Sequence, residues 1–65
     1  MVSKKRYISE MNEIYEITIE SCRDGYLVRV DGWPMDIVGS MQEAEQMEAR
    51  IARDLMLSPI CDDYL

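Results

Sequence analysis

Two short alternating segments on either side of a glycine turn constrain this chain most strongly. Residues 14–20, IYEITIE, alternate apolar and polar side chains and are rich in β-branched residues, which is typical of a half-buried strand. Residues 26–31, YLVRVD, repeat the alternation. Between them lies Asp24-Gly25, a dipeptide that suits a tight hairpin turn because glycine tolerates positive φ. The sequence therefore predicts an antiparallel hairpin.

A third strand is predicted after this hairpin. Gly32-Trp33-Pro34 interrupts the alternation and should reverse the chain, since proline cannot donate a ladder hydrogen bond. Residues 35–38 then form a short strand, with Met35 and Ile37 expected to face the core. Val38 is expected on the outward face.

One helix follows the strands. Ser40 and Glu43 match the capping box, in which the serine oxygen accepts from the N–H of residue 43 and the glutamate reaches back to the N–H of residue 40. The helix should extend to about residue 57, because Ser58-Pro59 ends it. Its apolar stripe consists of Ala44, Met47, Ile51 and Leu55, widened by Met41 and Ala52.

Together these elements predict an α+β fold: a three-stranded antiparallel meander with one C-terminal helix packed on one face. The expected contacts join Ile17, Ile19, Val28, Val30 and Ile37 of the sheet to Met47, Ile51 and Leu55 of the helix.

The first ten residues differ in charge from the rest. This segment contains three basic residues, Lys4, Lys5 and Arg6, and a single acidic one, whereas the chain from Met11 onward is strongly acidic. We expect residues 1–10 to be a mobile basic arm and residues 11–65 to be a single acidic domain. Two alternatives stay open: an extension upstream of a start at Met11, and a short helical lead-in with apolar residues at helical spacing.

The composition of the chain argues against two classes of function, nucleic-acid binding and catalysis. The chain of 65 residues has 13 acidic and 7 basic residues, a formal charge of −6 and no histidine. Direct nucleic-acid binding is therefore not expected, because phosphate would repel the chain. Without histidine, the usual proton shuttle near neutral pH is missing, so we expect no enzyme. An enzyme acting through Cys22 stays a remote alternative.

Other features point to a cytoplasmic protein without cofactor. No apolar run approaches the roughly 20 residues of a membrane span, and no signal peptide is recognisable. Cys22 and Cys61 are then expected to be free thiols, although an oxidising compartment would allow them to pair. Asp62-Asp63 falls well short of a calcium site, so no metal is expected.

The acidic residues of the predicted sheet are the first candidate binding site. Glu16 and Glu20 lie on its outward face, Asp24 at the hairpin tip, and Asp31 and Asp36 on either side of the Trp33 turn. Residues two apart on one face of a strand are separated by about 6.6 Å, a spacing suited to imitating a nucleic-acid backbone. The alternative is that these acids only solvate the outer face of the sheet.

Trp33 is the second candidate. A tryptophan in a turn suits a protein-protein interface, because this residue type is enriched among binding hot spots. It could equally cover the end of a core that contains no phenylalanine.

In size, charge and element order the chain resembles the small acidic proteins of phages, in particular anti-CRISPR proteins that inhibit Cascade-like complexes. The segment EITIESCRDGYLVRVDGWPMDIVGSMQEAEQMEARIA also resembles small uncharacterised bacterial domains in which a hairpin precedes a helix. The first resemblance implies a monomeric inhibitor in the host cytoplasm, acting as a DNA mimic on a protein partner with a basic nucleic-acid-binding surface. The alternative function is a structural or regulatory protein-binding adaptor, dimeric if a strand edge or apolar patch is exposed.

Overall fold

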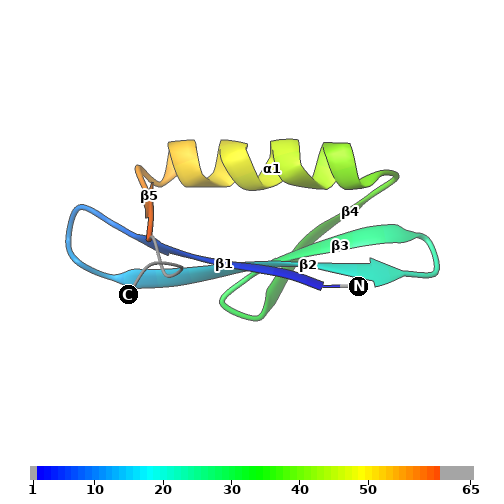
Figure 1. Ribbon diagram of the computed structural model, residues 1–65, viewed down its shortest axis with the longest axis horizontal. Coiled ribbons are helices and arrows are strands. Elements are labelled where there is room, and N and C mark those ends of the chain that lie inside the picture. Colours follow the sequence, from blue (N-terminus) through cyan, green and yellow to red (C-terminus); the bar gives the residue numbers. More distant parts are fainter. Residues whose placement is uncertain (1, 61–65) are drawn as a thin grey trace.

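One antiparallel sheet and one helix make up the part of the computed structural model that is described, residues 2–60 (Figure 1). Along the chain the elements are β1 (Val2–Ile8), β2 (Ile14–Cys22), β3 (Gly25–Val30), β4 (Trp33–Val38), α1 (Met41–Asp54) and β5 (Ser58–Pro59). The strand order in the sheet is β4-β3-β2-β1-β5, and α1 covers one face. The predicted α+β class is confirmed. The sheet has five strands among these residues, where three were expected.

The N-terminal segment belongs to the sheet. β1 pairs antiparallel with β2 from Val2 opposite Glu20 to Ile8 opposite Ile14, so the predicted mobile arm is wrong, and so is the helical alternative. Tyr7 is the buried side chain of this strand, only 8% exposed. Because most of β1 shows no apolar alternation, its pairing depends on β2 rather than on a local pattern.

The β2–β3 hairpin is confirmed. Cys22 pairs with Gly25, so the turn consists of residues 23–24 and Gly25 already begins β3. Gly25 has φ +139°, and a Cβ there would collide with the carbonyl oxygen of Val38 on β4. Only glycine fits this position without backbone movement.

The β3–β4 turn lies one residue earlier than expected. Asp31 (φ 53°) and Gly32 (φ 87°) form it, as positive φ at both central residues of a type I′ turn requires. Trp33 and Pro34 are therefore part of β4 and do not lie in the turn.

A β-bulge exchanges the faces of β4. The two-residue turn alone would place Met35 and Ile37 on the helix side of the sheet, as predicted. The register instead shifts after Val28, which pairs with Asp36. Each residue of β4 that follows this shift therefore points to the face opposite to the predicted one. Ile37 is 47% exposed as a result, and Val38 packs against the core.

The start of α1 follows the predicted capping box. Ser40 Oγ accepts a hydrogen bond from the N–H of Glu43 at 3.2 Å. Glu43 Oε1 accepts from the N–H of Gly39 at 3.2 Å, one residue before the predicted donor.

The helix ends earlier than expected. A Schellman motif follows Asp54: the Leu57 N–H donates to Ala52 O at 2.7 Å, and Met56 adopts a left-handed φ of 55°. Leu55 lies at this C-cap and is 46% exposed, so its predicted core contact is wrong.

The core lies between the helix and the sheet. Its buried apolar residues are Tyr7, Ile17, Ile19, Val28, Ala44 and Ala52. The expected packing of Ile17, Ile19 and Val28 is confirmed, whereas the helix contributes mainly small residues at its centre. These alanines let the helix approach the sheet closely.

Candidate functional site

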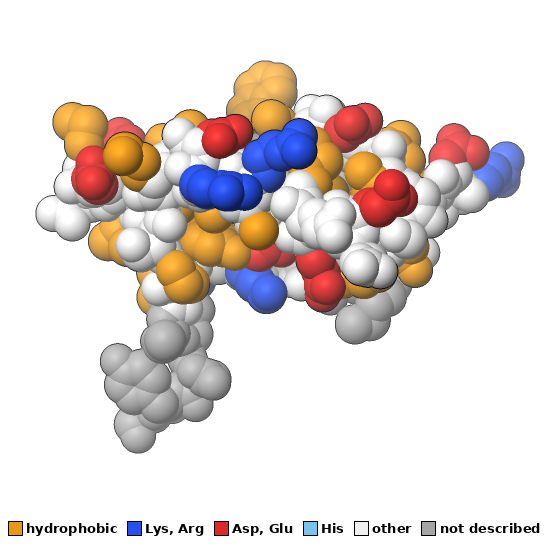
Figure 2. Space-filling model, turned by 90° about the horizontal axis from the view of Figure 1, so that it is seen from above, with side chains coloured by type: hydrophobic (Ala, Val, Ile, Leu, Met, Phe, Trp, Pro, Cys, Tyr) orange, Lys and Arg blue, Asp and Glu red, His pale blue; other side chains and the backbone are white. Residues whose placement is uncertain are grey.

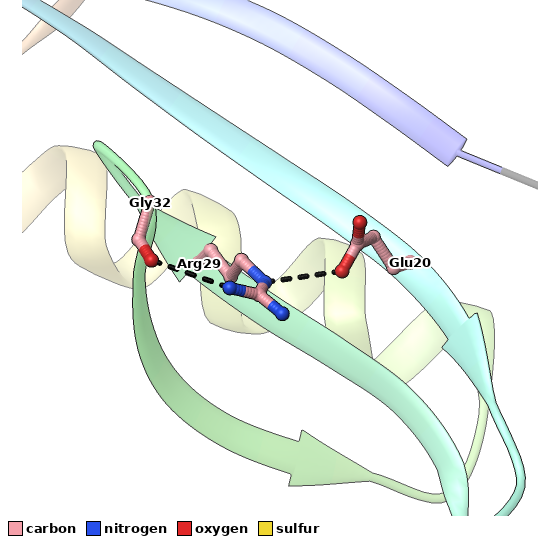
Figure 3. Close-up of polar contacts among 3 residues, drawn as sticks. All are labelled: Glu20, Arg29 and Gly32. Atoms are coloured by element: carbon pink, nitrogen blue, oxygen red, sulfur yellow. Dashed lines mark hydrogen bonds and ion pairs between the residues drawn. The ribbon is translucent and has the colours of Figure 1, made fainter.

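Glu20 and Arg29 form an ion pair on the sheet face opposite the helix (Figure 3). Glu20 Oε1 accepts from Arg29 Nε at 3.0 Å, and Arg29 Nη1 donates to the carbonyl oxygen of Gly32 at 3.3 Å. The Arg29 guanidinium therefore pairs with one of the predicted partner-binding acids, Glu20.

Glu16 and Asp31 are also engaged within the fold. Glu16 lies directly opposite Arg6 in the β1–β2 register. Asp31 Oδ1 accepts from the backbone N–H of Glu16 at 2.8 Å, which fastens the β3–β4 turn to β2. Glu16 faces β1, a strand that was not predicted, and the Asp31 bond depends on a turn that lies one residue earlier than expected.

The remaining two acids lie elsewhere. Asp24 is exposed in the turn between β2 and β3. Asp36 pairs with Val28, whose side chain is buried under α1, so Asp36 lies on the helix side of the sheet. The structure therefore does not gather the predicted acids on one face. On the helix side, acidic and basic side chains are interspersed among apolar ones (Figure 2).

Trp33 lies at the start of β4 and is 75% exposed. The interpretation that it covers the end of the core is therefore wrong. Met35 and Ile37 on the same strand are 52% and 47% exposed. β4 thus carries three large exposed hydrophobic side chains within six residues. Isolated exposed hydrophobic residues are ordinary, but a run on one strand is a candidate interaction surface.

The two edges of the sheet differ in chemistry. β5 covers the Tyr7–Ile8 end of β1, and the rest of β1 carries Lys4, Lys5 and Arg6. Charged residues and short covering strands are the devices by which natural sheets prevent unwanted pairing. β4 forms the other edge and presents the sequence WPMDIV, with one charge. Of these two edges, β4 is the less protected.

A groove of about 310 Å³ runs beside this edge, between β4 and α1. Its lining combines apolar and charged side chains: Asp36, Val38, Glu43, Gln46, Met47, Arg50 and Ile51. A protein segment bound along β4 would therefore contact both the open strand edge and this groove.

A buried polar group joins the helix to β1. Glu48 on α1 is 3% exposed and accepts a hydrogen bond from Tyr7 Oη. Lys5 Nζ lies 3.8 Å from the same carboxylate. Burial, and then the bond and charge of Glu48, raise the pKa of Tyr7 to about 12. Sequence analysis missed this group, although a glutamate three residues before Ile51 on the apolar stripe was a possible signal.

Other candidate chemistry finds little support. Cys22 is exposed and unpaired within the described residues. Cys61 and Asp62-Asp63 lie outside them. Residues 2–60 contain no group of three or more potential ligands that could hold a metal ion. In the same range, no helix has the length and apolar character needed to cross a membrane.

Comparison with known proteins gives no indication of the function of this chain. No protein-family model, curated protein or solved structure matches the chain.

Proposed function

We propose that this chain is a protein-binding module that docks its partner at the edge of β4, with Trp33 as the anchoring side chain. The exposure of Trp33 carries the proposal: 75% of its accessible surface faces solvent at one end of an open strand edge. Tryptophan is among the residues that contribute most to interface affinity. The proposed role is binding alone, in the cytoplasm, without catalysis, cofactor or metal.

Packing also supports this assignment. The buried core consists of isoleucine, valine, tyrosine and alanine side chains, and Trp33 is not among them. Truncating Trp33 should therefore change the stability of the chain little while removing most of its contact surface for a partner. A residue needed only for folding would show the opposite behaviour.

The test compares two exposed hydrophobic residues. The immobilised chain, its Trp33→Ala variant and its Met11→Ala variant are incubated with lysate, and the captured proteins are compared. Met11 is the matched control, because it is 82% exposed in the β1–β2 loop, away from β4. We expect Trp33→Ala to lose the captured partner and Met11→Ala to keep it, with both variants folded by circular dichroism. Equal capture by all three proteins would refute the proposal.

The same tryptophan provides a second measurement. It is the single tryptophan of the chain, so its fluorescence reports on one site. Burial against a partner should shift its emission to shorter wavelength.

Inhibition by acidic mimicry is the second candidate function, favoured by the net charge of −6. Its partner would be a basic nucleic-acid site, such as that of a Cascade-type complex. The geometry supports it less than docking at β4, because Glu20 is paired with Arg29 and Asp36 lies on the helix side.

Charge reversal separates the two functions. The first variant carries Glu16→Lys, Glu20→Lys and Asp24→Lys, and it leaves Asp31 unchanged because Asp31 fastens the turn that precedes Trp33. A matched variant reverses three exposed acids outside the predicted site, namely Glu10, Glu45 and Asp54. Mimicry predicts that the first variant loses binding far more than the second, whereas docking at β4 predicts similar and modest losses in both.

A further inference from the structure

We infer that the partner contributes an extended segment that pairs with residues 35–39 as an added strand, and that this segment places a Lys or Arg side chain beside Asp36. This inference rests on the proposed function and specifies its partner. It concerns the mode of binding and the charge of the bound segment, which the anchoring role of Trp33 leaves open.

Backbone chemistry supports strand addition. β4 is an edge strand, so one side of its backbone has no partner strand among the described residues. Pro34 has no N–H to donate, which restricts pairing to the part of the strand that follows it. The N–H groups of Ile37 and Gly39 donate to the carboxylates of Asp36 and Glu43, so an added strand would exchange these bonds for main-chain bonds, and its alternate side chains would supply specificity.

The groove determines the charge of the segment. Alternate side chains of an added strand point toward the helix side, over the groove between β4 and α1. Asp36 and Glu43 line this groove together with one base, Arg50, so acids outnumber bases there. Asp36 Oδ1 accepts from the N–H of Ile37 at 2.8 Å, and its second oxygen can accept from a partner. A cationic side chain is the complement of this site.

Charge also disfavours a second copy of the chain as the occupant. Two copies would each carry a net charge of −6. Antiparallel pairing around the middle of residues 35–39 would place the two Asp36 residues at diagonal positions on the same face, roughly 7–8 Å apart. Their like charges would repel each other. An extended basic segment avoids both penalties.

The experiment uses three synthetic peptides of about six residues, a usual strand length. The first alternates Lys and Val, the second alternates Glu and Val, and the third is the first with a central proline. Each is titrated into the full isotope-labelled chain, and backbone amide shifts and hydrogen exchange are recorded by NMR. We expect the Lys-Val peptide alone to shift and protect amides in residues 35–39.

Variants test the cationic contact. Asp36→Asn should weaken binding of the Lys-Val peptide roughly 2- to 5-fold, the range of an exposed ion pair. Glu45→Gln is the control, because Glu45 is exposed on α1 and is not part of the groove lining. It should leave the affinity unchanged.

Several results would overturn the inference. These are equal binding of the Glu-Val or proline peptide, no binding of any peptide, and shifts confined to the sheet face around Glu16 and Glu20. Concentration-dependent protection of residues 35–39 without peptide would show a second copy on the edge and would also overturn it. If Trp33→Ala loses its captured partner while no peptide protects β4, the proposed function stands and only the strand-addition mode fails.

Discussion

Removing the Tyr7 hydroxyl should destabilise this fold more than any other loss of a single oxygen atom. Glu48 is 3% exposed, and Tyr7 is its hydrogen-bond donor from β1. Among the described residues, the carboxylate in Tyr7→Phe would keep the ion pair with Lys5, at 3.8 Å and with a side chain 58% exposed. Bonds to charged groups contribute about 1.5–3 kcal/mol, and a buried charge left without its donor costs at least as much.

We therefore expect Tyr7→Phe to lower the free energy of unfolding by about 2–3 kcal/mol. A domain of this size has a total of roughly 3–10 kcal/mol, so the loss is a large fraction. The thermal midpoint should fall by roughly 10–20 °C. Urea unfolding followed by far-UV circular dichroism measures the change. Fluorescence is less suitable, because Trp33 is exposed in the folded chain.

Two further variants isolate the cause. Tyr15→Phe removes a hydroxyl that donates to the exposed Glu13 at 3.3 Å, so its cost should stay within about 0.5 kcal/mol. Adding Glu48→Met to Tyr7→Phe removes the orphaned charge and should restore roughly 1–3 kcal/mol. The reasoning fails if Tyr7→Phe is as stable as Tyr15→Phe, or if the double variant is no more stable than Tyr7→Phe.

Further predictions concern pH, helix ends and turns. Because the pKa of Tyr7 rises to about 12 on folding, the unfolded chain loses this proton first; the free energy of unfolding should fall by about 2–3 kcal/mol between pH 10 and 12, and urea titrations should show a smaller fall in Tyr7→Phe. Ser40→Ala removes the N-cap acceptor and should cost about 1 kcal/mol in urea unfolding. Met56→Gly should raise the free energy of unfolding by about 1 kcal/mol in urea titrations, because a φ of 55° is strained in methionine and not in glycine. Gly25→Ala should lower the free energy of unfolding by more than about 2 kcal/mol in the same measurement, roughly the cost of strain plus overpacking against the carbonyl of Val38.

Local signals in the sequence were sufficient for the central hairpin and the helix. The β2–β3 hairpin depends on alternation over each strand and on a turn next to Gly25, all within residues 14–31. The capping box at Ser40 likewise depends on residues adjacent in sequence. Such elements are specified by backbone preferences that act before the fold is complete.

β1 could not be predicted in the same way. Of the β1 side chains at positions 3–8, Tyr7 is the one buried beneath the helix, and no alternating apolar pattern marks the strand. Its three consecutive basic residues are typical of a solvated arm when read alone. Their partners lie elsewhere in the fold: Arg6 lies opposite Glu16 of β2, and Lys5 Nζ lies 3.8 Å from the carboxylate of Glu48 on α1. Long-range pairing decided the structure of this segment.

The candidate site depended on a detail that alternation cannot reveal. One extra residue in β4, Met35, lies between the Arg29–Pro34 and Val28–Asp36 pairs; it moves Asp36 to the helix side and turns Ile37 toward solvent. Had β4 paired without the bulge, Ile37 would have joined the core, and Asp36 would have lain on the same open face as Glu20, with Leu27 between them. The bulge instead leaves Ile37 exposed on the edge strand and brings Asp36 to the groove beside α1, which is why β4 and its Trp33 provide the stronger argument for binding.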